Sequence, residues 1–131
     1  MTSSIVTGNA AQALGSKTGG WVVGYFAEQK LTHSPHFEIK IWHYDSQPDY
    51  GQKVFRGTEF IIVEGGVLTL ELESDNGDDD SIVQKFELKG SARQYIIIPP
   101  NCKKRVWVTE APTYGITVRW PSTPGMNVKC Q

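Results

Sequence analysis

Hydrophobic and polar residues alternate along much of the chain after residue 20, and this two-residue period predicts β-strands. The clearest case is residues 37–43, in which Phe37, Ile39, Ile41 and His43 fall on one face. The other face carries Glu38, Lys40, Trp42 and Tyr44. Further segments of strand character lie at residues 21–26, 82–88, 95–98, 105–109 and 114–120.

Residues 58–70 predict two strands joined by a tight turn at the centre of the fold. Residues 60–63 are apolar on both faces, which is typical of a strand that is covered on both sides. Gly65 and Gly66 supply the positive φ angles that a hairpin turn needs. Beyond them, leucines alternate with polar residues through residue 73, so we expect one buried and one exposed face.

The whole pattern predicts an all-β fold. About eight short strands are separated by Gly, Pro, Asn and Asp, and no helical period of useful length follows residue 20. We expect a flexible N-terminal arm at residues 1–20, a β-barrel at residues 21–121 and a C-terminal tail at residues 122–131. A chain of 131 residues is long enough to bury one core without disulfides.

Composition narrows the range of partners. Thirteen basic and fourteen acidic residues give a net charge of -1, so no overall field attracts nucleic acid or an anionic membrane. Cys102 and Cys130 are too few for a disulfide framework, and no apolar run is long enough to span a membrane. We therefore expect a cytoplasmic protein with reduced thiols, whose partner is a small molecule.

Two short stretches resemble the motifs of the cupin superfamily. Residues 62–70 resemble the end of the first motif, where a strand reaches a Glu-Gly turn and an amphipathic strand leaves it. Residues 95–104 are similar to the strand that enters Pro-x-Gly-x-x-His in the second motif, with Asn101 in place of the Gly. Asn tolerates a left-handed turn position best after Gly, so this exchange is mild. The resemblance implies a cupin-like jelly-roll barrel with a ligand pocket in one mouth, often assembled as a homodimer.

The metal ligands of the family are missing from this alignment. Metal-binding cupins use His-x-His and a Glu from the first motif and a His from the second. Counted back from Gly65, the spacing places Thr58 at the Glu position and Gly51 and Lys53 at the two His positions. Glu59 is one residue away, and alternation turns it to the opposite face unless a bulge shifts the register. The resemblance therefore implies no metal, and we expect no other cofactor.

Lys104 stands at the His position of the second motif. If Lys53 and Lys104 both occupy former ligand positions, their ammonium groups converge and suit a carboxylate or phosphate. Alternatively, Lys53 lies in a solvated loop and Lys104 belongs to an exposed basic turn. The first hypothesis is a metal-free protein that binds a small molecule, such as a carboxylate or another anion.

Five further residues complete the candidate site. His43 continues the apolar face of its strand, so it either lines the pocket as a general base, fills the core or marks an exposed strand end. Thr58 is included for its motif position, and Trp107 and Arg119 for an aromatic wall that could stack on a ring or sugar. A second hypothesis is a metal-independent isomerase or lyase in which His43 transfers a proton, helped by Tyr95 or Tyr50. A third is a structural homodimer whose barrel is filled by side chains, so enzymatic activity stays open.

Cys102 follows the Pro-Pro-Asn turn and precedes three basic residues. Positive charges next to a thiol lower its pKa, so this position predicts a thiolate at the barrel mouth. No His accompanies it in the sequence, and an incidental cysteine is the simpler interpretation. The acidic run at residues 75–80 lacks the spacing of a calcium loop and predicts a solvated hairpin tip.

Overall fold

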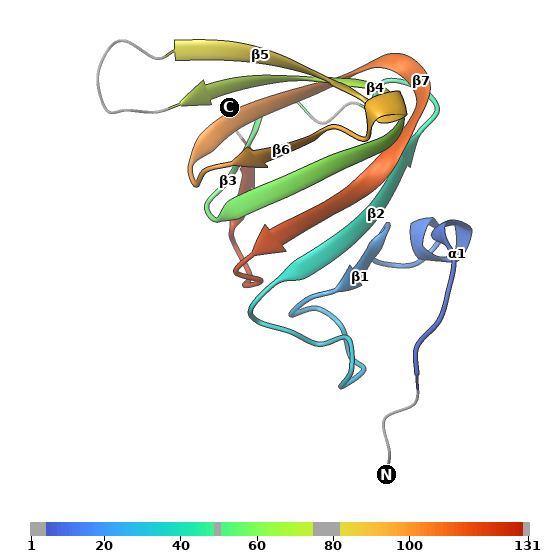
Figure 1. Cartoon of the computed structure of the whole chain (residues 1–131). Helices are drawn as coiled ribbons and strands as arrows, with labels where there is room; N and C mark the ends of the chain where they lie inside the picture. Colours follow the sequence, from blue (N-terminus) through green and yellow to red (C-terminus); the bar gives the residue numbers. More distant parts are fainter. Residues whose placement is uncertain (1–4, 49–50, 75–81, 130–131) are drawn as a thin grey trace.

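The computed structural model describes residues 5–48, 51–74 and 82–129 (Figure 1). Within these ranges the chain forms a curled antiparallel sheet of eight strands, one short α-helix and one 3₁₀ turn. The elements are α1 (Ala10–Leu14), β1 (Trp21–Val23), β2 (Glu38–Tyr44), β3 (Lys53–Phe55), β4 (Thr58–Ser74), β5 (Ile82–Lys89), η1 (Gly90–Ala92), β6 (Tyr95–Ile98), β7 (Cys102–Trp120) and β8 (Asn127–Lys129). The all-β, cupin-like fold class predicted from the sequence is confirmed.

The long strands β4 and β7 pair with each other over most of their length and bend together (Figure 1). Before the bend, β4 also pairs with β6, and β2 and β1 continue the sheet beyond β7. After the bend, β4 also pairs with β5, while β3 and β8 continue the sheet on the far side of β7. The bent β4–β7 ribbon thereby joins a first sheet (β1–β2–β7–β4–β6) to a second sheet (β8–β3–β7–β4–β5).

The predicted hairpin at Gly65 and Gly66 is wrong, because β4 runs through both glycines without reversing. Its register against β7 shifts at three steps between Val63 and Leu68, which marks a β-bulge at the bend. Gly66 has a φ of 69°, so the positive φ predicted for it is present but serves a bend, whereas the positive φ predicted for Gly65 is wrong. The two strands predicted at residues 105–109 and 114–120 are likewise parts of the single strand β7.

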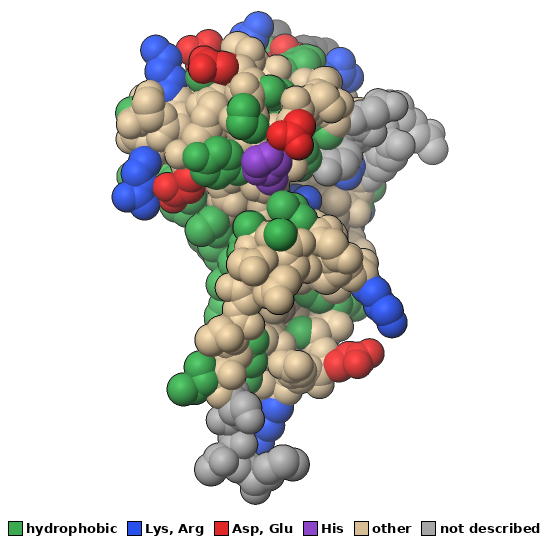
Figure 2. Space-filling model, turned by 90° about the vertical axis from the view of Figure 1, so that its right-hand side faces the viewer, with side chains coloured by type: hydrophobic (Ala, Val, Ile, Leu, Met, Phe, Trp, Pro, Cys, Tyr) green, Lys and Arg blue, Asp and Glu red, His purple; other side chains and the backbone are tan. Residues whose placement is uncertain are grey.

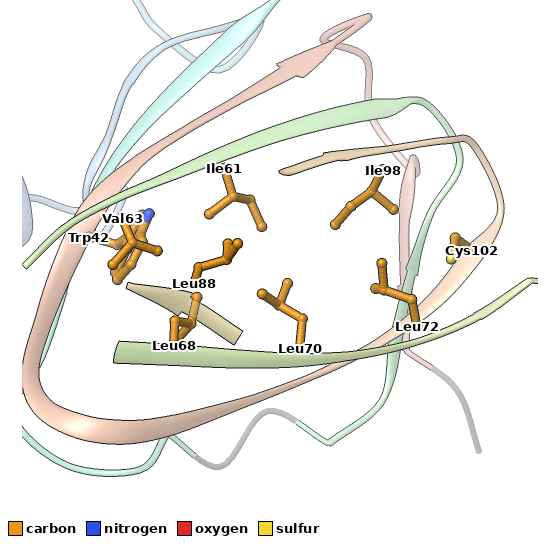
Figure 3. Close-up of a cluster of buried hydrophobic side chains, with 9 residues drawn as sticks. All are labelled: Trp42, Ile61, Val63, Leu68, Leu70, Leu72, Leu88, Ile98 and Cys102. Carbon is orange, nitrogen blue, oxygen red and sulfur yellow. The ribbon is translucent and has the colours of Figure 1, made fainter. Parts of the chain in front are cut away.

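The core lies between the two sheets, where side chains from both halves of β4 meet (Figure 3). Leu68, Leu70 and Leu72 are buried, which confirms the alternation predicted for them. Before the bend, the inward side chains are at odd positions, and Ile61 and Val63 are among them. The bulge shifts the inward side of β4 from odd to even residue numbers. The rest of the cluster comprises Trp42, Leu88, Ile98 and Cys102.

In β2 the more polar face points inward, which reverses the expectation for His43. Trp42 is only 4% exposed, and Lys40 and Tyr44 line the same interior. The apolar face of β2 therefore lies on the outside, where Phe37 is 41% exposed. The reason is that the barrel interior near β2 is a polar cavity, whereas the outer side of the first sheet is apolar.

We call this outer side of the first sheet the outer apolar face, and it comprises Phe60, Tyr95, Ile97, Tyr114 and Ile116. Cross-strand pairs hold these residues together: Phe60 pairs with Ile97, and its ring stacks on Tyr95 with centroids 5.5 Å apart. Tyr95 is 61% exposed and Ile97 56%. A continuous apolar surface of this kind is unusual on a monomer and is typical of an interface.

The segments that flank the barrel are partly anchored to it. Asn9 caps α1 through the backbone N–H of Gln12, and α1 contacts β1 and β2. Whether residues 1–20 are flexible stays a prediction. Beyond residue 121, Ser122 is buried. The sequence analysis does not predict β8, which pairs with β3. The predicted acidic hairpin tip lies outside the described residues.

Two local features complete the fold. Asn101 has a φ of 65°, so the left-handed turn predicted for this position is confirmed. Across the described residues, the model contains no helix that is long and apolar enough to cross a membrane.

We predict that Gly66→Ala destabilises the protein strongly. A methyl group there would collide with the carbonyl oxygens of Glu110 and Pro112 in β7, in addition to the cost of positive φ. The matched control is Gly125→Ala, because Gly125 also has positive φ (77°) but has open space around its Cα. Urea unfolding should show a loss of about 1–2 kcal/mol for Gly125→Ala and a clearly larger loss for Gly66→Ala. Equal losses would show that the bend tolerates a side chain.

Candidate functional site

A cavity of about 160 Å³ lies between the two sheets. Aromatic rings of Trp21, Trp42 and Tyr44 line it from β1 and β2, and apolar core residues from β4 and β7 close another side. Its most unusual feature is the charge of its lining, because four cationic side chains from three strands contribute to it. They are Lys40 from β2, Lys53 from β3, and Lys104 and Arg119 from β7.

Glu59 is the buried counter-charge to this cluster. Lys104 Nζ donates to one carboxylate oxygen of Glu59 and Arg119 Nε donates to the other. Glu59 is only 1% exposed. Burial by itself raises the pKa of Glu59, but the charges and hydrogen bonds of Lys104 and Arg119 outweigh it and lower the pKa to about 2. Glu59 therefore carries a full negative charge at neutral pH.

Arg119 is held on several sides. Its guanidinium lies 4.9 Å from the ring centroid of Trp21 and 4.8 Å from that of Phe55. Its Nη1 lies 4.0 Å from Oε1 of Glu38, whose other oxygen accepts a hydrogen bond of 3.0 Å from the Ser122 hydroxyl. Burial raises the pKa of Glu38, opposed by Ser122 and Arg119. These contacts fix the guanidinium plane at the cavity wall.

Lys40 stands out among the cations. Its Nζ lies 5.6 Å from the ring centroid of Trp21. Burial lowers the pKa of Lys40 to about 8, with further lowering from Arg119, Lys104 and Lys53, while Glu59 raises it. Like charges gathered in a partly closed space disfavour one more proton. The cavity is thus a region of positive potential.

Trp42 adds a hydrogen-bond donor without an acceptor. Among the described residues, its Nε1 is the one buried side-chain polar atom that has no hydrogen-bond partner. Trp42 lines the cavity, where its ring stacks on Tyr44 with centroids 5.5 Å apart. An unmade hydrogen bond at a buried donor costs about 1–3 kcal/mol.

The structure brings together three of the residues that the sequence analysis proposes. Lys53 and Lys104 are directly opposite each other in the β3–β7 pair and both line the cavity, and Arg119 joins them. The alternative interpretation placed Lys53 in a solvated loop and Lys104 in an exposed basic turn. Instead, both lysines lie in strands and line the cavity. Their role in ligand binding stays a prediction.

The other proposed residues do not line the cavity. His43 lies on the outer side of β2, where its Nε2 is 3.0 Å from Asp45 Oδ1 and its ring stacks on Tyr114. Tyr95 belongs to the outer apolar face, and Trp107 lines a shallow depression on the outside of the second sheet. Thr58 begins β4 opposite Trp120, on the same side of the strand as Phe60. His43, the general base in the hypothesis of proton transfer, therefore does not reach the cavity. Tyr50 lies outside the described residues.

Two residues of the site, Glu59 and Lys40, are missing from the sequence prediction. Glu59 was assigned to the opposite face because the spacing was counted from Gly65. Counted from Gly66, which has the positive φ, the same spacing leads to Glu59. Ile61 and Val63 are also odd-numbered residues of β4 and are buried, which likewise places Glu59 on the inward side of the strand. Lys40 was missed because the apolar face of β2 was expected to point inward.

Cys102 is another correction. The thiol is buried in the core, and burial raises its pKa, although the charge of Lys104 lowers it. The thiolate predicted from the basic neighbours is therefore wrong, because burial outweighs the positive charge.

The residues at the former metal position do not fit a metal ion. Its expected ligands are imidazole nitrogens and a carboxylate. Lys53 and Lys104 supply ammonium groups instead, and both oxygens of Glu59 already accept hydrogen bonds. Across the described ranges, no group of three or more His, Cys, Asp or Glu residues could hold a metal. We therefore derive no chemistry through a metal at this position.

We predict that Glu59→Gln destabilises the protein by about 3–5 kcal/mol, because it leaves Lys104 and Arg119 buried without their counter-charge. Glu64→Gln is the matched control, since Glu64 pairs with Arg93, whose side chain is 70% exposed. Chemical unfolding at neutral pH should show little change for this control. A loss for Glu59→Gln no greater than that for Glu64→Gln would refute the buried cluster.

We also predict a specific acid dependence. The folded-state pKa of Glu59 is about 2, below the ordinary value of 4.5 for a glutamate, so its stabilisation is present above pH 4.5 and is lost as the pH falls toward 2. Melting temperatures of wild type and Glu59→Gln should therefore converge over this range. A constant difference between the two proteins from pH 6 to about pH 2 would contradict the assignment.

Comparison with known proteins places the fold. No protein-family model matches the chain, and no curated protein matches it significantly. A recombinant oxalate oxidase in complex with glycolate matches with a TM-score of 0.64 and 16% identity, over 98% of this chain and 62% of that chain. Oxalate decarboxylase from Bacillus subtilis matches with a TM-score of 0.62 and 10% identity, over 82% of this chain.

A formate complex of oxalate decarboxylase from Lactobacillus farciminis is similar too, with a TM-score of 0.63 and 7% identity over 83% of this chain. The chain spans only 26% of the Bacillus subtilis decarboxylase and 30% of the Lactobacillus one. These neighbours are cupin-superfamily proteins. At such low identity the likeness establishes the fold alone, and the chain has the cupin jelly-roll fold.

Proposed function

We propose that the protein binds a small carboxylate, or a similar small anion, in the barrel cavity without the help of a metal ion. The observation that carries this proposal is the gathering of Lys40, Lys53, Lys104 and Arg119 around one cavity. Glu59 contacts Lys104 and Arg119 of this cluster, and Glu38 contacts Arg119. An anionic ligand in the cavity would meet all four cationic side chains.

The hydrogen-bonding character of the wall points to the same class of ligand. Ammonium and guanidinium groups only donate hydrogen bonds, and so does the Trp42 indole. The buried Trp42 Nε1 has no acceptor of its own within the protein. A carboxylate consists of acceptors only, so it complements such a wall. The aromatic rings of Trp21 and Trp42 leave room for a short apolar part of the ligand.

The cavity volume limits the size of the ligand. At about 160 Å³ it is close to the volume of about 150 Å³ that holds one benzene molecule in an engineered protein core. A ligand of roughly six non-hydrogen atoms therefore fits. The third sequence hypothesis, a completely filled barrel, does not anticipate this space.

The structural neighbours give modest support. All three are named for oxalate, one of them in complex with glycolate and another in complex with formate. The Bacillus subtilis enzyme has Mn(II) centres, whereas cationic side chains line the cavity of the present chain. We propose that the cations of this chain supply the positive charge that the metal supplies in such a relative.

Surface charge gives no competing reason to propose a nucleic-acid partner. The net charge is -1. On the face shown in Figure 2, charged side chains of both signs are scattered among neutral ones. The concentration of positive charge is thus a property of the cavity rather than of this face.

We predict that malonate or oxalate raises the melting temperature and that Lys53→Met weakens its binding about tenfold or more, because a charge-assisted hydrogen bond contributes about 1.5–3 kcal/mol. Lys103→Met is the matched control, since Lys103 neighbours Lys104 in β7 but does not line the cavity. Calorimetric titration in the presence of a metal chelator measures both variants. Saturable binding that survives Lys53→Met unchanged, or that disappears with the chelator, would overturn the proposal.

We further propose that the protein forms a homodimer through the outer apolar face. The support is the exposure of Tyr95, Ile97 and Tyr114 on one side of the first sheet. Aromatic and aliphatic side chains that pack against a second copy would remove this apolar area from water.

A charge in the centre of the face tests the homodimer. Ile97→Lys should give a monomer in sedimentation analysis, because it buries an unpaired charge in the interface. Ile82→Lys is the matched control: Ile82 is 58% exposed, much as Ile97 is at 56%, but it lies at the start of β5 in the second sheet. A wild-type protein that is monomeric at micromolar concentration would refute the proposal.

A further inference from the structure

We propose that Lys40 is an amine nucleophile, which forms an imine with the carbonyl group of a small 2-oxo acid held in the cavity. This inference rests on the proposed function, because the carboxylate of the 2-oxo acid has to bind there first. It adds a covalent step, which simple anion binding does not require.

The position of Lys40 supports this role. It lies near the middle of β2, and its side chain enters the cavity rather than the outer surface. Trp21 from β1 covers it on one side, with the ring centroid 5.6 Å from Nζ. The other charged groups that act on it are Lys53 from β3, Lys104 and Arg119 from β7, and Glu59 from β4. Lys40 therefore lies in the cavity, with cationic side chains from β3 and β7 near it.

These surroundings favour a neutral amine. An ordinary lysine is almost fully protonated at neutral pH and is a poor nucleophile. Burial, followed by the charges of Arg119, Lys104 and Lys53, lowers the pKa of Lys40 to about 8. Glu59 opposes this shift, but both of its oxygens are engaged by Lys104 and Arg119. A lysine beside other cations in a partly desolvated site is a known way to prepare an amine for imine formation.

The same cations select the partner of the amine. A guanidinium group binds carboxylates with good geometry, and Arg119 places one at the cavity wall. A carboxylate bound beside Arg119 and Lys104 leaves its α-carbon within the same cavity as Lys40. In a 2-oxo acid this carbon is a carbonyl carbon, and the smallest 2-oxo acids have about six non-hydrogen atoms, in keeping with the volume of the cavity.

The step balances without an oxidant or reductant. The lone pair of neutral Lys40 Nζ attacks the carbonyl carbon, a C–N bond forms, and the carbonyl electron pair moves to oxygen, which takes up a proton. The nitrogen loses a proton, and the hydroxyl group then leaves as water after protonation while a C=N bond forms. Hydrolysis reverses the sequence and returns the free lysine. The neighbouring cations stabilise the negative charge that develops on oxygen.

The test is reductive trapping. Full-length protein is incubated with pyruvate and sodium borohydride, and the site of the adduct is found by intact mass and peptide mapping. We expect a single stable adduct on Lys40, suppressed by excess malonate, which has no ketone. Lys40→Arg should abolish labelling, and Lys85→Arg, which removes an exposed lysine of β5, should leave it unchanged. The labelling rate should rise with pH as Lys40 loses its proton near pH 8.

The outcomes separate this inference from the proposed function. If malonate binds saturably but pyruvate leaves no adduct on Lys40, the imine is refuted and anion binding stands. If malonate does not bind at all, the proposed function itself fails. Adducts spread evenly over surface lysines would also overturn the inference. Mapping on the wild-type protein needs no variant, and Lys40→Met provides a second test if Lys40→Arg does not fold.

Discussion

The structure depends on the pairing of β4 with β7 along a shared bend. Each strand belongs to both sheets, so the ribbon fixes how the two sheets face each other and where the cavity lies between them. Glycine makes the bend possible, since the backbone of Gly66 approaches carbonyl oxygens of β7 more closely than a side chain would permit. The bulge in β4 then shifts the alternation of side chains by one residue, so that odd-numbered residues face inward before it and even-numbered residues after it.

The same ribbon carries the buried ion cluster. Glu59 of β4 and Lys104 and Arg119 of β7 meet at the cavity wall, and Lys104 and Arg119 lie on opposite sides of the bend. Removing charges from water is costly, so this cluster is weak evidence for added stability. The cluster also sets the character of the cavity wall, because Lys104 and Arg119 line the cavity and Glu59 holds both of them.

Part of the candidate site could be found from the sequence and part could not. The motif resemblance pointed to Lys53 and Lys104, and both line the cavity, although the count from Gly66 that leads to Glu59 no longer places Lys53 at a His position. It failed for Glu59, since a difference of one residue in the turn position reverses the face of a strand. It failed for Lys40 and His43 because the apolar side of β2 is the outer side. The usual rule that apolar residues face the core does not hold beside a polar cavity.

The sequence by itself determined the fold class, most of the segments that form strands and the turn at Asn101, because a period of two and turn residues act locally. The buried leucines of β4 followed from the same local rule. Only the tertiary structure decided that Gly65 and Gly66 bend a continuous strand, and that Lys40, Lys53, Lys104 and Arg119 share one cavity. The physical reason is that a strand's partners, and therefore the inward side of its pleat, are set by hydrogen bonds between segments far apart in the chain. Local sequence patterns do not identify those partners.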